Sequence, residues 1–294
     1  MNEGAARPAA FWSAAGNGAV DCALCPHNCR IPEGAAGFCG IRRNSGGALY
    51  ASNYGRVSAI ALDPVEKKPL YMFHPGKYVL SIGGFGCNLR CPFCQNSEIS
   101  TEYDKAPRDA GYVSPERVAE LAKKAVPEGN IGVAYTYNEP LIGYEYLRDC
   151  AGLVRGAGLL NVAVTNGYIN AEPLEALLPL IDAMNIDLKG FSEGFYQNLS
   201  GGLEAIKNTI ALSHKRCHVE ITTLIIPGEN DSEPEIAELA RWLASLSPEI
   251  PLHLTRFFPR YRYSDRAPTP RGTVQRLCGV AKKYLANVYA GNMY

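Results

Sequence analysis

The chain is organised around one short stretch, Gly86-Cys87-Asn88-Leu89-Arg90-Cys91-Pro92-Phe93-Cys94-Gln95-Asn96. Its three cysteines are spaced C-x3-C-x2-C and follow an apolar run of strand type, residues 78–82, which two glycines close. The sequence therefore predicts a cysteine loop that leaves the end of a buried strand. Three thiolates on one loop can hold three corners of an iron–sulfur cube, and no fourth cysteine is near in sequence. The fourth iron would then be open to a small molecule.

This spacing, with the aromatic Phe93 before the last cysteine, resembles the signature of the radical S-adenosylmethionine (SAM) superfamily. The resemblance implies that Cys87, Cys91 and Cys94 hold a 4Fe-4S cluster whose open iron binds the amino and carboxylate groups of SAM. It also implies that an electron from the cluster cleaves SAM to a 5′-deoxyadenosyl radical. A zinc knuckle or three unrelated buried cysteines are the alternative interpretations, because cysteine is often buried as a small hydrophobe.

Composition limits the class of protein. The chain has 294 residues, enough for one large domain with a small appendage, and its 29 basic residues balance 29 acidic ones. This balance gives no support to a nucleic-acid partner. The apolar runs fall short of a membrane span, and the first twenty residues lack a secretory pattern, so we expect a cytoplasmic protein. In a reducing cytosol, clustered cysteines more often bind metal than form disulfides.

A second cysteine group lies near the N-terminus, after a loose lead-in of about twenty residues. Its members are Cys22, Cys25, Cys29 and Cys39, spaced C-x2-C-x3-C-x9-C among Pro and Gly. So short a segment has too little apolar area to fold alone, which predicts a metal-folded module. Zinc and an iron–sulfur cluster both fit four thiolates, and packing or redox-reactive thiols are the alternative.

The connection to the main domain carries a charged turn between two prolines, Asp63-Pro64-Val65-Glu66-Lys67-Lys68-Pro69-Leu70. Its charges could line a substrate entrance or simply face solvent, and the sequence does not decide between the two. Residues 50–60 before it are compatible with a pair of strands.

From residue 78 onward, strand-like and helix-like runs alternate. The predicted strands are 78–83, 130–136, 160–165, 183–188, 217–226 and 251–257, and the predicted helices are 114–126, 140–156, 172–180, 201–214, 231–246 and 270–284. Continuous apolar strands indicate a parallel sheet covered by helices. We therefore predict an α/β fold, an open (β/α)6 TIM-like barrel of the radical SAM type, over residues 78–288. An N-terminal cysteine-rich module with its connection, 1–77, and a tail, 289–294, flank it.

Polar residues gather at the predicted strand ends, where βα barrels carry their chemistry. Glu139 follows the second strand and is placed to meet the amino group of SAM. Lys189, after the fourth strand, is placed to meet the carboxylate, and Asp187 could orient Lys189 or touch substrate. A surface glutamate at a helix start and a simple surface ion pair are the alternative interpretations.

Four further side chains are candidates. Thr165 and Asn166 can hydrogen-bond the ribose or methionyl part of SAM, although an Asn-Gly turn explains them equally simply. Phe93 would contact the adenine. His253 and Arg256, on the last strand, are candidates for the substrate side, with a core histidine as the alternative for His253.

Taken together, the motifs from Cys22 to Arg262 resemble the AmmeMemoRadiSam system radical SAM enzymes, relatives of the pyruvate formate-lyase activating enzymes. The resemblance implies an enzyme that needs an electron donor such as flavodoxin or ferredoxin, with proteins of the AmmeMemoRadiSam system as possible partners. Hydrogen would be abstracted from a protein or small molecule that the sequence does not identify. A glycyl-radical-enzyme activase is an alternative, although the N-terminal cysteines differ from the ferredoxin insert of some activases. An iron–sulfur electron carrier and a zinc protein are further alternatives, but neither needs Glu139, Lys189 or a barrel.

Overall fold

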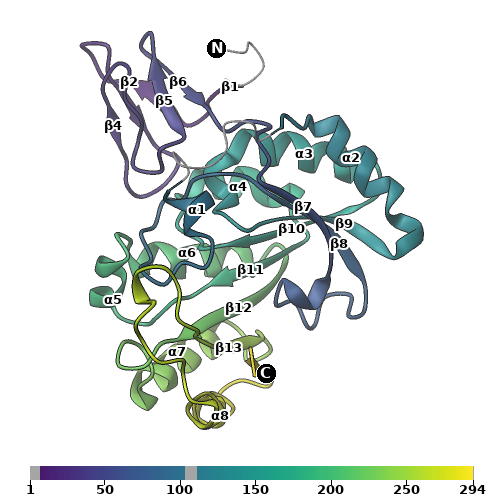
Figure 1. Ribbon diagram of the computed structural model, residues 1–294, viewed down its shortest axis with the longest axis vertical. Helices are drawn as coiled ribbons and strands as arrows, with labels where there is room; N and C mark the ends of the chain where they lie inside the picture. Colours follow the sequence, from purple (N-terminus) through teal and green to yellow (C-terminus); the bar gives the residue numbers. More distant parts are fainter. Residues whose placement is uncertain (1–6, 103–110, 294) are drawn as a thin grey trace.

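The computed structural model describes residues 7–102 and 111–293, and an eight-stranded sheet forms its centre (Figure 1). The strands are β7 (Ala59–Pro64), β8 (Tyr78–Gly83), β9 (Asn130–Thr136), β10 (Leu160–Thr165), β11 (Ala183–Asp187), β12 (His218–Ile225), β13 (Leu252–Arg256) and β14 (Val288–Gly291). Their spatial order follows the sequence from β7 to β14. Strands β8 to β14 run parallel, and β7 pairs antiparallel with β8. The sheet has two ends in its pairing order, as an open barrel does.

Helices alternate with the parallel strands and confirm the predicted partial (β/α)6 barrel. The main helices are α2 (Pro115–Lys124), α3 (Tyr144–Gly156), α4 (Ala171–Leu177), α5 (Glu193–Asn198), α6 (Leu203–Ser213), α7 (Glu233–Leu246) and α8 (Arg271–Ala281). Ser114 and Ser232 accept hydrogen bonds from the third backbone N–H that follows each, and a proline comes early in both helices. These caps explain why α2 and α7 begin close to where the sequence predicts.

Short helices fill several connections. They are α1 (Ser97–Ser100) and the 3-10 turns η1 (Val65–Lys67), η3 (Val126–Glu128), η4 (Pro140–Gly143), η5 (Leu178–Leu180) and η6 (Tyr261–Tyr263). Among residues 7–102 and 111–293, each helix is too short or too polar to cross a membrane.

The sheet extends past the predicted barrel range at both ends. Strand β7 belongs to the segment expected to be a connection, and most of β14 lies in the expected tail. The suggested strand pair in residues 50–60 is wrong, because β6 (Ala48–Ala51) pairs with β1 and β5, whereas β7 pairs with β8. Local pattern indicates a strand, but the partner is selected by the apolar face that two strands can share.

The N-terminal residues form a small lobe of two three-stranded antiparallel sheets at one end of the barrel sheet (Figure 1). Its strands are β1 (Arg7–Pro8), β2 (Trp12–Ala14), β3 (Val20–Cys22), β4 (Arg30–Ile31), β5 (Arg42–Ser45) and β6. Two of them, β1 and β2, fall in the expected loose lead-in, so its described part, residues 7–20, contains two short strands. A buried ion pair of 3.0 Å joins Arg42 of the lobe to Glu145 of α3.

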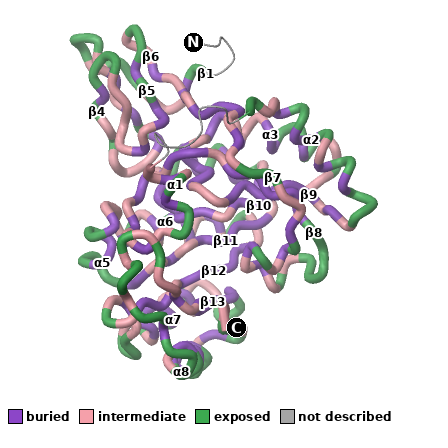
Figure 2. The backbone as a smooth tube through the Cα atoms, viewed as in Figure 1, coloured by how far each residue is buried: buried purple, intermediate pink, exposed green. Residues whose placement is uncertain are grey.

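One hydrophobic core runs through both parts of the chain. Val20 and Ile31 of the lobe belong to the same buried cluster as Leu80 of β8 and Ile186 of β11. Figure 2 shows the buried positions following the central strands, whereas exposed positions lie on the outer surfaces of the helices. The lobe is therefore packed against the barrel and does not hang from it on a linker.

Candidate active site

A cavity of about 360 Å³ lies inside the barrel and opens at the carboxyl ends of the strands. Its lining includes all three cysteines of the organising loop, together with Phe93, Glu139, Thr165, Asn166, Asp187 and Lys189. The residues predicted to bind the iron–sulfur cluster and those predicted to bind SAM thus follow different strands but line the same cavity. This convergence follows from parallel pairing, which brings the strand ends to the same edge of the sheet.

The cysteine loop is held in place by backbone contacts on both sides. The Gly86 N–H donates to Ile99 O at 2.8 Å and the Arg90 N–H donates to Leu199 O at 2.8 Å. Gly86 has φ of +90°, and a Cβ there would lie 2.8 Å from Ile41 Cγ2, so the position requires glycine. The loop therefore enters the cavity with a fixed path.

The sulfur atoms suit a shared iron–sulfur group. The Leu89 N–H and Asn166 Nδ2 approach Cys87 Sγ at 3.4 and 3.6 Å, the kind of contact that stabilises a thiolate in such clusters. Burial raises the pKa of the Cys91 thiol to about 11, and the positive charge of Lys189 opposes this rise. Each thiol must lose its proton to act as a ligand, so the positive iron would supply the missing stabilisation.

Glu139 is buried, with 3% of its surface exposed, which excludes the interpretation of a surface glutamate. Its carboxylate accepts from Leu141 N at 2.9 Å, from Thr165 Oγ1 at 2.7 Å and from Asn166 N at 2.7 Å. Burial raises its pKa to about 7, although these hydrogen bonds lower it. A carboxylate offers about four lone-pair positions, so one remains for a ligand cation.

Lys189 and Asp187 form an ion pair of 2.8 Å at the end of β11. Both side chains line the cavity, and they keep 16% and 34% of their side-chain surface exposed. Burial alone would lower the pKa of Lys189, but the charges of Asp187 and Cys91 hold it above its ordinary value. The ammonium is thus a cation at the cavity wall, oriented by Asp187 as the sequence suggested.

The remaining SAM candidates are more constrained than expected. Thr165 donates to Glu139, and Asn166 donates to Asn88 Oδ1 at 3.0 Å and accepts from Tyr168 N at 2.8 Å. The two side chains therefore support the shape of the site as well as lining it. Phe93 lies at the cavity wall and stacks on Phe195 with ring centroids 6.3 Å apart.

The two substrate-side candidates lie outside the cavity lining. His253 is buried and pairs through Nε2 with Glu220 Oε2 at 2.6 Å, with the ring of Tyr289 stacked on it. Arg256 Nε donates to Thr269 O at 2.5 Å. Both residues belong to β13, and Thr255, which lies between them in sequence, lines the cavity instead. Alternate residues of a strand face opposite sides, so His253 and Thr255 share a face and differ in depth along the barrel.

The charged turn lines the cavity, which the sequence had left undecided. Lys67, Lys68 and Pro69 form part of its wall, and the Tyr137 hydroxyl donates to Asp63 at 2.7 Å. Tyr137 has φ of +72°, rare for a non-glycine residue. The sequence gives no sign that the Tyr137 hydroxyl reaches the charged turn.

The four N-terminal cysteines lie in the lobe, with Cys22 and Cys39 buried and Cys25 and Cys29 partly buried. Within residues 7–102 and 111–293, no group of three or more His, Cys, Asp or Glu side chains has an arrangement that could hold a metal ion. Cys29 Sγ accepts from the Phe38 N–H at 3.4 Å, and burial raises the pKa of the Cys25 thiol to about 12. The second metal site predicted for these cysteines, zinc or an iron–sulfur cluster, stays a prediction. Thiols that bind a four-iron cluster each contact a different iron, so they do not gather around one point as the ligands of a single ion do.

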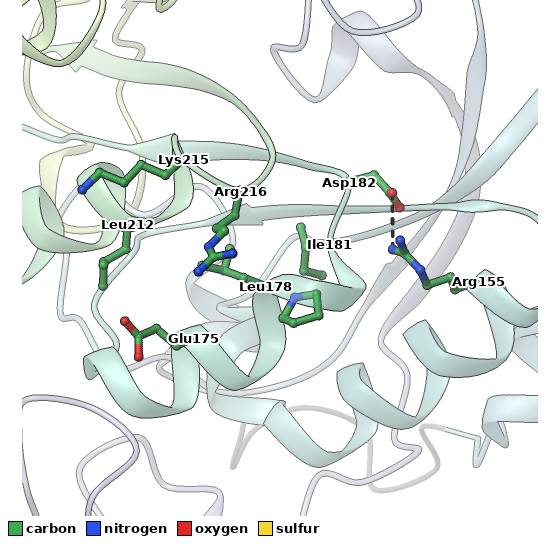
Figure 3. Close-up of a pocket in the computed structure, with 9 residues that line it drawn as sticks. Arg155, Glu175, Leu178, Ile181, Asp182, Leu212, Lys215 and Arg216 are labelled. Atoms are coloured by element: carbon green, nitrogen blue, oxygen red, sulfur yellow. Dashed lines mark hydrogen bonds and ion pairs between the residues drawn. The ribbon is translucent and has the colours of Figure 1, made fainter.

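A second hollow, of about 760 Å³, lies at the opposite end of the barrel (Figure 3). It sits before the starts of β11 and β12, where Arg155 and Asp182 are 3.5 Å apart and Lys215 lies across from them. No cysteine lines this hollow. Chemistry in βα barrels is carried at the other end, so we assign the site to the smaller cavity.

Comparisons with known proteins identify the family of the chain. A sequence profile described as the Radical SAM superfamily matches residues 81–240. An uncharacterised protein of Methanocaldococcus jannaschii, MJ0808, is 39% identical over 98% of this chain and 85% of its own length. The mitochondrial GTP 3′,8-cyclase of Arabidopsis thaliana is 29% identical over 66% of this chain and 51% of its own.

A solved structure shares the fold. Streptococcus suis SuiB bound to precursor peptide SuiA aligns with a TM-score of 0.54 and 15% identity, over 70% of this chain and 46% of that one. At that identity the likeness concerns the fold alone.

Proposed function

The chain belongs to the radical SAM superfamily, whose members use a 4Fe-4S cluster and SAM, and on this premise we propose that it is an enzyme that cleaves SAM reductively. When bound, the cluster and SAM supply a 5′-deoxyadenosyl radical that abstracts hydrogen from a substrate. A reductant such as flavodoxin or ferredoxin would deliver the electron. The observation that carries the proposal is that three cysteine thiols, a buried carboxylate and a lysine line one cavity.

The cysteine loop would hold the cluster through Cys87, Cys91 and Cys94. Hydrogen bonds to Cys87 Sγ from Leu89 and Asn166 would stabilise its negative charge. The amide of Asn88 donates to Tyr168 O at 2.6 Å and fixes the loop against the end of β10. These residues keep the thiols in the cavity and leave one side of the site to the cofactor.

Glu139 and Lys189 would bind the two charged groups of the methionyl part of SAM. The ammonium group of SAM would bind at the last free position of the Glu139 carboxylate. The carboxylate group of SAM would bind Lys189. Both are charge-assisted contacts in a buried site, where they are strongest. Asp187 would keep Lys189 oriented, while Thr165 would keep Glu139 oriented.

The test is anaerobic reconstitution with iron, sulfide, reductant and SAM, scored for 5′-deoxyadenosine. Alanine at Cys87, Cys91 or Cys94 should each abolish 5′-deoxyadenosine formation, since each would remove one iron ligand. Cys217→Ala is the matched control, because that thiol does not line the cavity. Normal output from any of the three loop variants would sink the proposal.

A further inference from the structure

The barrel is closed at its amino end by a strap, residues 65–72, that runs from η1 across the starts of the strands. Pro69 O accepts from Asn185 Nδ2 of β11 at 2.8 Å. The Tyr71 and Met72 N–H groups donate to the Glu220 carboxylate of β12 at 3.0 and 2.7 Å. Since the cysteines enter from the opposite end, the strap residues Lys67, Lys68 and Pro69 form the floor of the cavity.

The floor carries a buried cation with unused hydrogen-bond donors. Lys68 is 3% exposed, and its Nζ donates to Asp63 Oδ2 at 2.8 Å. An ammonium has three N–H donors. Among the described residues, Asp63 is the one side chain that accepts a hydrogen bond from Lys68, and the face of the Tyr137 ring lies 4.7 Å from Lys68 Nζ. Burying donors without partners is costly, so a ligand that accepts them would be favoured.

The local charge also favours an anion. Asp63 meets Lys68 through one carboxylate oxygen and Lys67 through the other, at 2.7 Å, and it accepts from the Tyr137 hydroxyl as well. Two ammonium groups therefore share one carboxylate, which leaves the floor with one net positive charge. Burial lowers the pKa of Lys68, while its pairing with Asp63 opposes that change.

We infer that the floor binds a carboxylate group of the substrate, with Lys68 as its direct ligand. The inference rests on the proposed function and deepens it. One net charge and one buried ammonium match a single carboxylate better than a doubly charged phosphate. A substrate anchored there would extend upward toward the SAM end of the cavity, where hydrogen is abstracted. At that upper end, Lys189 is paired with Asp187 and would bind the carboxylate of SAM, so the cations left for a substrate carboxylate are those of the floor.

The test uses acetate as the probe and acetamide as its neutral isostere. Each is titrated calorimetrically into the reconstituted, SAM-loaded enzyme at neutral pH and constant ionic strength. The wild type should bind acetate saturably and ignore acetamide. Lys68→Gln removes the charge but keeps an N–H for Asp63, and it should weaken acetate binding at least tenfold. Lys124→Gln, at an exposed position of α2, is the matched control and should bind as the wild type does.

Asp63→Asn should change the affinity for acetate in the opposite direction. It removes the carboxylate that offsets the two lysines, so acetate should bind more tightly than to wild type. This variant decides the question if Lys68→Gln fails to fold by circular dichroism. The inference is overturned by no saturable acetate binding, by equal binding to Lys68→Gln, or by weaker binding to Asp63→Asn. SAM cleavage is scored separately, so failure of the proposed function is distinguishable from failure of this site.

Discussion

At the scale of single residues, the cavity is defined by charges that are buried but incompletely satisfied. Glu139 holds three hydrogen bonds and keeps one acceptor position, while Lys189 is paired with Asp187 and still faces the cavity. A buried charged residue with only a structural role would use all of its hydrogen-bonding positions within the protein. These two keep enough to bind the opposite ends of a zwitterion.

Glu139→Gln and Lys189→Met should each weaken SAM binding, because each removes one charge that faces the cofactor. Loss of a charged partner costs about 1.5–3 kcal/mol, which corresponds to roughly tenfold or more in affinity. Neither change should remove the cluster. SAM titration of the reduced enzyme, followed by electron paramagnetic resonance, measures the effect. Exposed Glu128→Gln and Lys124→Met serve as controls, and unchanged affinity in both site variants would place SAM elsewhere.

At the scale of elements, the N-terminal lobe is fastened to the barrel by buried polar contacts. Glu145 of α3 meets Arg42 of β5 and also accepts from the Ala10 N–H at 2.8 Å. Arg90 of the cysteine loop donates to Phe38 O and stacks on the Phe38 ring, 4.1 Å from its centroid. The lobe therefore contacts both the barrel wall and the loop that carries the cluster ligands.

Glu145→Gln should destabilise the protein by roughly 3 kcal/mol, since it leaves Arg42 as a buried charge without its partner. Urea unfolding at neutral pH measures this loss. The double variant Arg42→Met, Glu145→Met should lose less than Glu145→Gln, because it removes both charges. A single variant as stable as the wild type would show that the ion pair does not fasten the lobe.

The N-terminal cysteines give a second prediction at this scale. If they bind an additional metal or cluster, Cys22→Ala with Cys25→Ala should lower the total metal per chain while leaving the spectrum of the radical cluster largely intact. Elemental analysis before and after the change measures it, with Cys217→Ala as the control. The same metal content in the double variant would mean that these thiols are packing residues.

At the scale of the whole molecule, the strap closes the amino end of the barrel, so the cavity opens at the carboxyl ends of the strands. Glu220 is the anchor of the strap, because one buried carboxylate accepts from two strap N–H groups and contacts His218 at 2.9 Å and His253 at 2.6 Å. Burial would raise the pKa of Glu220, but these contacts outweigh it and lower the value from 4.5 to about 2. The ionised form is thus bound more strongly in the folded protein than in the unfolded one.

The depressed pKa fixes the sign of a pH effect. Glu220 stabilises the fold fully above its unfolded pKa of 4.5, and the contribution falls as the pH drops toward about 2. Glu220→Gln should therefore be clearly less stable than wild type at pH 7, and the difference should shrink between about pH 4.5 and 2. Urea midpoints of both proteins in the same metal-free form test this. A difference that does not change with pH would mean that the charge of Glu220 is not what holds the strap.

The sequence alone determined the fold class and the bounds of the six main parallel strands within a residue or two. It also determined that the three loop cysteines, Glu139 and Lys189 lie together in one cavity. It could do so because these features are local: apolar period, helix caps and strand ends are written in neighbouring residues, and parallel pairing then brings the ends together.

Only the tertiary structure decided what depends on contacts between distant segments. The addition of β7 and β14 to the sheet, the pairing of His253 with Glu220 and the place of Lys68 at the cavity floor join residues tens to hundreds of positions apart. No local pattern encodes such contacts, because their free energy arises from burial and charge that exist only once the chain has closed. The charged turn shows this most directly: its sequence is compatible with a solvated loop or a substrate entrance, and in the structure it lines the cavity.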